Sequence, residues 1–147
     1  MTTKLYSGEE LNTVFNSNIN NKLFFNKVAI DSREVSNRGI FFAIKGDHDD
    51  GHRYVSGVLK NKNNLAIISK GPKNTRSIRS KNTLESLRNL ASYARQRSNA
   101  KIVAITGSCG KTSLKNLLNS SLSRFGKTHC SPKSFNNHFG APYSLAN

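Results

Sequence analysis

The sequence predicts an α/β protein, and three features of its 147 residues carry that prediction. Short apolar runs alternate with amphipathic stretches, the usual order of strands and helices around a parallel sheet. One run ends in a glycine-rich turn that opens a helix. The chain continues from Lys101 only to Asn147, which is too short for a second sheet domain. We therefore expect a small N-terminal α/β domain followed by the incomplete start of a P-loop parallel-sheet domain, and hence a fragment.

Composition places the chain in the soluble globular class. Hydrophobic residues make up 35% of it, and no apolar run approaches the roughly 20 residues that cross a bilayer. The polar N-terminus leads into no signal-type segment, so we expect a cytoplasmic protein without membrane insertion. Cys109 and Cys130 are too few for a disulfide framework or a four-ligand zinc site. Both are expected to be free thiols.

The formal charge of +15, from 23 Lys and Arg against 8 Asp and Glu, invites a nucleic-acid interpretation. The basic residues are scattered among Asn and Ser, however, and Trp is absent, so no aromatic stacking platform is evident. We expect a basic surface around anionic small substrates and no specific nucleic acid. A basic P-loop nucleotide-binding module or a nucleic-acid-associated ATPase stays open as the alternative.

Helix and strand signals alternate through the first part of the chain. Ser7 followed by Glu10 has capping-box spacing, and Leu11 begins an apolar helical stripe. Leu87 and Ala91 stand four residues apart on one face of a longer predicted helix. The predicted elements are a helix after Ser7, strands at residues 27–30, 40–44 and 65–68, a turn at 37–39, and helices at 54–59 and 83–98.

Residues 101–105 are predicted as a buried strand that ends at a glycine-rich turn. Gly107 and Gly110 permit backbone conformations that other residues resist, so successive amide N–H groups can face one concavity. Lys111 adds a positive charge. The helix predicted from about Thr112 directs its unpaired N–H groups and its dipole at the same anion. These features predict a phosphate-binding loop.

The loop is a shortened form of the common pattern, with Ile105 where the first glycine usually stands. Thr112 or Ser113 offers a hydroxyl to magnesium, and Cys109 is expected to be a small loop filler. Leu117 and Leu122 give the following helix an apolar side that a complete sheet would cover. The candidate cofactor-binding residues of the loop are Thr106, Gly107, Ser108, Cys109, Gly110, Lys111, Thr112 and Ser113.

Three motifs follow one another along the chain. They are Asp31-Ser32-Arg33 with residues 39–46 and Asp50-Gly51-His52, then residues 106–113, and then residues 134–142. Together they resemble the N-terminal third of a Mur ligase, one of the ATP-dependent amide-forming enzymes of peptidoglycan synthesis. The last motif is similar to the Asn-Asn-Glu-Ile-Gly-x-Pro segment of the D-alanyl-D-alanine-adding members. His138 and Phe139 replace its acid and its isoleucine.

The resemblance implies two domains, a UDP-substrate-binding domain at residues 1–98 and the truncated start of the central ATP-binding domain at residues 99–147. It also implies that Lys111 is catalytic, pairing with the transferring phosphoryl group, and that the Thr112 hydroxyl approaches Mg²⁺. Asn136 and Asn137 join the loop residues as ATP contacts. The implied substrate-binding residues are Ser32, Arg33, Gly46, Asp50, Gly51 and His52.

Purely structural roles remain open at several of these positions. Asp31 and Asp50 can cap their loops, and His52 can be a structural histidine with satisfied hydrogen bonds. The pair Asn136 and Asn137 can equally cap the helix that follows.

The activity implied by the resemblance is addition of D-alanyl-D-alanine to UDP-N-acetylmuramoyl-tripeptide through an acyl phosphate, with ATP and Mg²⁺. Within the family, the tripeptide-forming members are the alternative. We expect a monomer. The isolated chain is expected to be inactive, because the remaining metal ligands and the amine-delivering domain would lie outside it.

Overall fold

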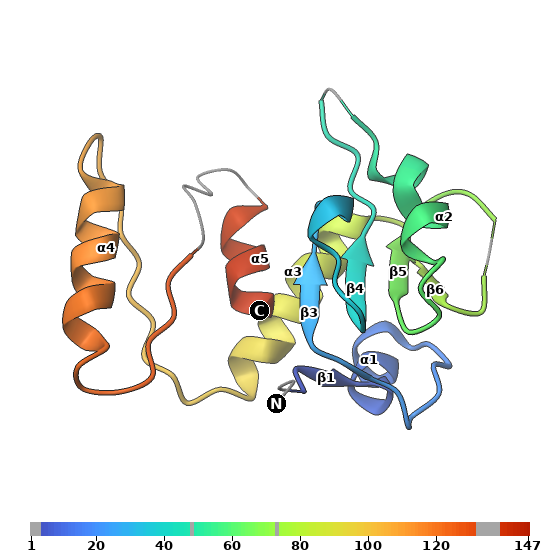
Figure 1. Cartoon of the computed structure of the whole chain (residues 1–147), viewed down its shortest axis with the longest axis horizontal. Coiled ribbons are helices and arrows are strands. Elements are labelled where there is room, and N and C mark those ends of the chain that lie inside the picture. The colour runs from blue at the N-terminus through green and yellow to red at the C-terminus, as the bar shows by residue number, and fades with distance from the viewer. Residues whose placement is uncertain (1–3, 48, 73, 132–138) are drawn as a thin grey trace.

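The computed structural model describes residues 4–47, 49–72, 74–131 and 139–147 of the chain. A four-stranded parallel sheet forms the centre of its first part (Figure 1), as the α/β prediction requires. The strands stand side by side in the order β3 (Lys27–Ala29), β4 (Gly39–Phe42), β5 (Leu65–Ile68) and β6 (Ser77–Arg79).

The rest of the described chain consists of a small two-stranded sheet and several helical elements. Two short strands, β1 (Tyr6–Ser7) and β2 (Phe24–Phe25), pair antiparallel beside the parallel sheet. The helical elements are α1 (Gly8–Phe15), η1 (Ser32–Glu34), η2 (Gly51–Tyr54), α2 (Val55–Val58), α3 (Thr83–Gln96), α4 (Lys111–Leu122) and α5 (Gly140–Ala146), of which η1 and η2 are 3₁₀ helices.

Alternate residues of β4 point to opposite sides of the sheet. Ile40 and Phe42 belong to the larger apolar core, which α1, α3 and α5 share, whereas Phe41 belongs to a smaller core under α2. Because both faces are covered, β4 and β5 are buried at every position. Strands buried on both faces read as unbroken apolar runs, which is why the sequence identified them.

The start of α1 confirms the predicted capping box. The Ser7 hydroxyl accepts a hydrogen bond from the Glu10 backbone N–H at 3.2 Å, and the Ser7 N–H donates to the Glu10 carboxylate at 2.7 Å. Gly8 is required next, because a Cβ atom there would lie 2.2 Å from the carbonyl oxygen of Asn20. The antiparallel strands β1 and β2, and the edge strand β6, were not predicted; each has only two or three residues.

Helix α5 packs against α3 and reaches the open edge of the sheet (Figure 1). The buried Tyr6 hydroxyl donates to the carbonyl of Ala146 at 2.7 Å. The Asn147 side chain accepts from the Val28 N–H at 3.0 Å and donates to the Val28 carbonyl at 3.2 Å. This amide therefore pairs with the edge strand β3 much as another strand would, and it satisfies backbone groups of a fully buried residue.

Because Tyr6 is buried, the free energy of unfolding of the chain should fall as the pH rises into the alkaline range. Burial raises the pKa of Tyr6 to about 12. The unfolded side chain loses its proton near pH 10 and the folded one does not, so Tyr6 favours the folded state below pH 10 and loses that contribution as pH rises through 12. We expect a decline on the order of 2 kcal/mol, measured by urea unfolding at several pH values. The matched Tyr6→Phe variant should lack this component; an identical decline in both proteins would contradict the assignment.

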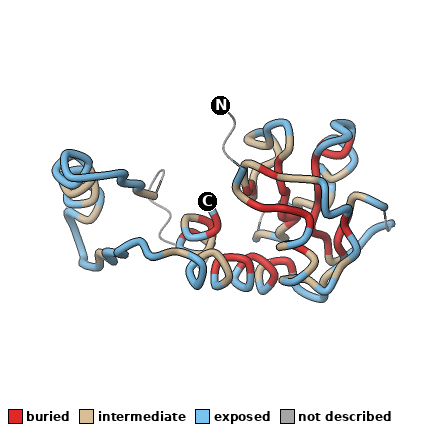
Figure 2. The backbone as a smooth tube through the Cα atoms, turned by 90° about the horizontal axis from the view of Figure 1, so that it is seen from below, coloured by how far each residue is buried: buried red, intermediate tan, exposed pale blue. Residues whose placement is uncertain are grey.

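The second part of the chain has far less packing. Helix α4 stands apart from the sheet, with α5 between them, and residues 99–130 are exposed over most of their length (Figures 1 and 2). Leu117 is 64% exposed and Leu122 is 42% exposed. This confirms the expectation that the phosphate-loop helix lacks its full set of apolar partners.

The predicted strand at residues 101–105 is wrong, because these residues form no strand. A β-strand exists only when its backbone pairs with a neighbour. All strands in the described ranges belong to the two sheets above, and residues 101–105 pair with neither of them. The side chains of Ile102 and Val103 are exposed.

The division of the chain at residue 98 stays a prediction. The segment from 99 to 131 projects away from the sheet, whereas α5 returns to pack on α3. Within the described part of the chain, no helix combines the length and apolar character needed to cross a membrane.

Candidate functional site

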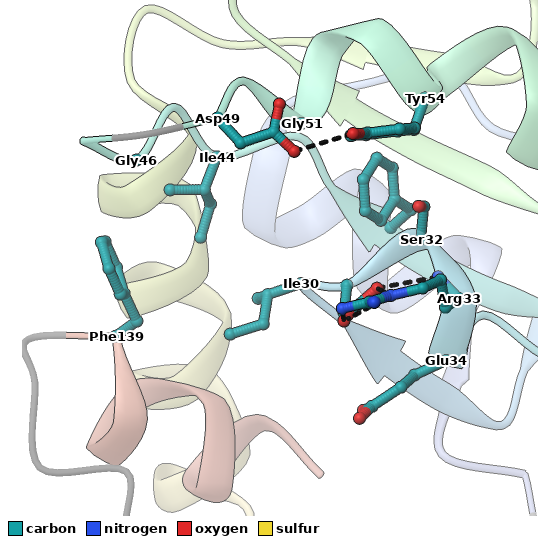
Figure 3. Close-up of a pocket in the computed structure, with 12 residues that line it drawn as sticks. Ile30, Ser32, Arg33, Glu34, Ile44, Gly46, Asp49, Gly51, Tyr54 and Phe139 are labelled. Carbon is teal, nitrogen blue, oxygen red and sulfur yellow. Dashed lines mark hydrogen bonds and ion pairs between the residues drawn. The ribbon is translucent and has the colours of Figure 1, made fainter.

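A cavity of about 520 Å³ opens where strands β3 and β4 end (Figure 3). Ligands of parallel sheets characteristically bind at the carboxyl ends of the strands, and this volume suits a small molecule. The lining residues are Ile30, Asp31, Ser32, Arg33, Glu34, Phe41, Ile44, Gly46, Asp49, Gly51, Tyr54 and Phe139.

The segment after β3 presents a guanidinium group to this cavity. Asp31 caps η1 by accepting from the backbone N–H of Arg33 at 2.9 Å. The same carboxylate accepts from Nε and Nη2 of Arg33, at 3.0 and 2.7 Å, in a bidentate pair. Hydrogen bonding to Asp31 raises the pKa of Arg33. The proposed capping role of Asp31 is thus confirmed, and the pair fixes an exposed cation at the cavity wall.

The loop after β4 forms another wall. The Gly46 N–H donates to the Asp49 carbonyl at 2.8 Å, and the Gly51 N–H donates to the Ile44 carbonyl at 2.9 Å. A Cβ atom on Gly51 would lie 3.0 Å from backbone atoms of Ile44, so the close approach favours glycine. The Tyr54 hydroxyl donates to the Asp49 carboxylate at 2.8 Å, and this bond raises the pKa of Tyr54.

Asp50 and His52 hold this loop in place through contacts outside the cavity. Asp50 caps η2 through the His52 N–H, lies 2.6 Å from His52 Nδ1, and pairs with Lys70 Nζ at 2.5 Å. The Lys70 and His52 contacts hold the pKa of Asp50 well below its usual range. The Ser69 N–H donates to His52 Nε2 at 2.9 Å, so the ring carries its proton on Nδ1, where it donates to Asp50. His52 thereby ties the loop to the end of β5.

The cavity collects four of the six predicted substrate-binding residues: Ser32, Arg33, Gly46 and Gly51. Asp50 and His52 do not line it, and their contacts match the structural roles left open for them. The apolar lining, including Ile30, Ile44 and Phe139, was not predicted: Ile30 and Ile44 were interpreted as strand ends, and Phe139 only as a departure from the motif at residues 134–142. The alternation of apolar residues with polar ones at the two strand ends was the available signal.

Replacing His52 with alanine should destabilise the fold. The change leaves the Ser69 N–H without its acceptor and removes a hydrogen bond to Asp50, which together cost about 2 kcal/mol. Thermal or urea unfolding measures the loss. His129→Ala is the matched control, because His129 is exposed. Equal stability of the two variants would contradict the bracing role.

The glycine turn before α4 has the backbone expected of a phosphate-binding loop. Gly107 has a φ of 150° and Gly110 a φ of 76°, which L side chains rarely adopt. Gly110 precedes the first residue of α4 with no side-chain cap. Lys111 Nζ donates to the carbonyl of Gly107 and, at 3.4 Å, to that of Ser108. The ammonium therefore lies over the loop that leads into α4.

The remaining loop predictions fall on exposed positions. Thr112 and Ser113 lie in the first turn of α4, and Cys109 is a free thiol, as is Cys130. Asn136 and Asn137 lie outside the described residues. Across the ranges that are described, no three His, Cys, Asp or Glu residues gather in a way that could hold a metal ion. The loop still suits Mg²⁺, which proteins often bind through few side chains together with substrate phosphates.

The cavity and the phosphate loop are separate in this structure. Figure 1 places α4 and the loop before it on one side of α5, and the sheet with its cavity on the other. The residues predicted for the two ligands are therefore not brought into one site.

Comparisons with known proteins agree on one group of relatives. Over 84% of its length, the chain is 35% identical to the UDP-N-acetylmuramoyl-tripeptide--D-alanyl-D-alanine ligase of Buchnera aphidicola. The crystal structure of MurF from Acinetobacter baumannii matches 99% of the chain, with a TM-score of 0.83 and 27% identity. MurF from Thermotoga maritima, solved in complex with ADP, matches 82% of the chain, with a TM-score of 0.69 and 28% identity. Other bacterial relatives carry the same ligase name.

The chain spans only part of these proteins, namely 27% of the Buchnera aphidicola ligase, 34% of the Acinetobacter baumannii chain and 29% of the Thermotoga maritima chain. A search of protein-family models finds no match. The relatives named above are ligases, so they give no support to the nucleic-acid-associated alternative.

Proposed function

Because this chain corresponds to a partial region of a MurF-like Mur ligase, we propose that it supplies the substrate cavity and the phosphate loop of an enzyme that adds D-alanyl-D-alanine to UDP-N-acetylmuramoyl-tripeptide. The observation that carries the proposal is the presence, in one chain, of a cavity at the carboxyl ends of β3 and β4 and of a glycine loop over which Lys111 lies. In the sequence, the motifs that supply the cavity precede the glycine loop, which is the order on which the family resemblance rests.

The proposed reaction has two steps. A carboxylate oxygen of the tripeptide attacks the γ-phosphorus of ATP, and ADP leaves. The amine of D-alanyl-D-alanine then attacks the acyl carbon and phosphate leaves, which forms the amide bond. Lys111 neutralises charge on the transferring phosphoryl group, an electrostatic task that needs no side-chain nucleophile.

In this proposal the cavity binds the uridine diphosphate part of the substrate. Ser32 and Arg33 face it with a hydroxyl and a cation, while Gly46 and Gly51 shape the opposite loop. Asp50 and His52 support that loop without lining the cavity. An exposed guanidinium on a rigid carboxylate partner suits recognition of phosphate oxygens.

ATP binding is assigned to residues 106–113 together with Asn136 and Asn137. When bound, Mg²⁺ supplies positive charge at the phosphates, and the Thr112 hydroxyl is the group of this chain that would hold it. A relative solved with ADP supports the use of an adenine nucleotide. We further propose that the active enzyme is a cytoplasmic monomer longer than this chain, and that the 147 residues alone are inactive.

Amide chemical-shift mapping on the ¹⁵N-labelled chain tests both assignments at once. UDP-N-acetylmuramoyl-tripeptide should shift the resonances of Ser32, Arg33, Gly46 and Gly51. Mg²⁺–ATP should instead shift those of residues 107–113. If ATP alone produces shifts, and random duplex DNA also produces them at physiological salt, the basic P-loop alternative replaces the ligase proposal.

A further inference from the structure

One residue of the cavity comes from far along the chain. Among the described residues that line it, Phe139 alone lies outside the segment from Ile30 to Tyr54. Figure 3 shows its ring entering the cavity from α5, on the side of Ile30 and Ile44. In the sequence, Phe139 is distinguished only by replacing the isoleucine of the motif at residues 134–142.

The position of Phe139 is fixed by the rest of α5. Tyr143 and Ala146 are buried in the main core, and Tyr143 donates its backbone N–H to the Phe139 carbonyl at 2.9 Å. The Tyr6 hydroxyl and the edge of β3 hold the other end of the helix. The ring is thus presented to the cavity from a helix anchored at several points, which favours a contact of defined geometry.

The two sides of the cavity differ in chemistry. Ile30, Ile44 and Phe139 give it one apolar side, whereas Ser32, Arg33 and Glu34 stand on the other side in Figure 3, together with the Tyr54 ring. A pyrimidine nucleotide is divided in the same way, with a flat ring at one end and phosphate oxygens at the other. An aromatic ring stacks on a base through its face, and a guanidinium binds phosphate oxygens.

We infer that Phe139 is a substrate-contacting residue whose ring packs against the pyrimidine base of the uridine nucleotide. The inference rests on the proposed function, because it requires the cavity to bind uridine nucleotides. Its consequence is that the cavity is complete only with α5 docked, so the substrate site includes a helix that follows the phosphate loop in sequence.

Calorimetric titration of the chain with UDP tests the inference. Phe139→Ala should raise the Kd for UDP about tenfold and leave the Kd for pyrophosphate, which has no base, within twofold. Phe125→Ala is the matched control, because it removes the same ring from a position that is 88% exposed and remote from the cavity. It should leave both constants unchanged.

The Phe139→Trp variant provides a second test that does not depend on correct folding of the alanine variant. It keeps a flat ring, so its Kd for UDP should stay within threefold of the parent value. The chain has no other Trp, so UDP should change the indole emission directly.

The two proposals fail in different ways. If the parent chain binds UDP and Phe139→Ala binds it equally well, or if the indole emission is unaffected at saturation, the Phe139 inference is wrong and the cavity assignment stands. If Phe139→Ala weakens the binding of nucleotide sugars but leaves the Kd for UDP unchanged, the proposed contact with the base is also wrong. If the parent chain does not bind UDP at all, the cavity assignment itself is wrong.

Discussion

Replacing Lys111 with alanine is expected to lower turnover of the complete ligase about a thousandfold while leaving its melting temperature unchanged. The ammonium acts on charge that develops on the transferring phosphoryl group, and removing such a group typically costs two to three orders of magnitude or more. Its observed partners are carbonyls of its own exposed loop, so it contributes little to stability. Steady-state kinetics and a melting curve on the same variant measure both effects.

Lys127→Ala is the matched control, because Lys127 is an exposed lysine outside the loop. It should retain parental turnover. Near-normal turnover of the Lys111→Ala enzyme would remove the phosphate-loop assignment, and a large drop in melting temperature would show that Lys111 is structural.

Two leucine-to-alanine changes should show that the two parts of the chain contribute differently to its free energy of unfolding. Leu87 in α3 is fully buried in the main core, so Leu87→Ala should cost about 3 kcal/mol of unfolding free energy. Leu117 in α4 is 64% exposed, so Leu117→Ala should cost less than about 0.5 kcal/mol. Urea unfolding of the isolated chain compares them directly.

Amide hydrogen exchange on the same chain provides the independent check. The N–H groups of α3 should exchange slowly and those of α4 quickly, because α4 lacks apolar cover. A Leu117→Ala cost similar to that of Leu87→Ala, or strong protection throughout α4, would show that this helix is stabilised on its own.

The sheet could be predicted because its strands carry their own signal. Residues of β4 and β5 are apolar throughout, since helices cover both faces, and the Ser7 to Glu10 capping box marked the start of α1. The strand predicted at residues 101–105 has a similar apolar run, but a strand also needs a neighbour, which a run does not encode. The paired strands β1 and β2 were not predicted because two residues give no periodicity.

The site shows the same division between local and distant information. Ser32 and Arg33 belong to a short motif after β3, so the family resemblance named them from the sequence, and both line the cavity. The bracing of the loop by His52 depends on Ser69, 17 residues away. Phe139 reaches the cavity only because α5 packs on α3 and on the edge of β3, and nothing local to residue 139 indicates that arrangement.

The most direct test of the central claim is phosphate release by the complete ligase that contains this chain, measured with each substrate omitted in turn. The account predicts sustained release only when ATP, UDP-N-acetylmuramoyl-tripeptide and D-alanyl-D-alanine are present together, and its loss in the Lys111→Ala enzyme. Release that continues without the uridine nucleotide, or that responds to nucleic acid instead, would contradict it.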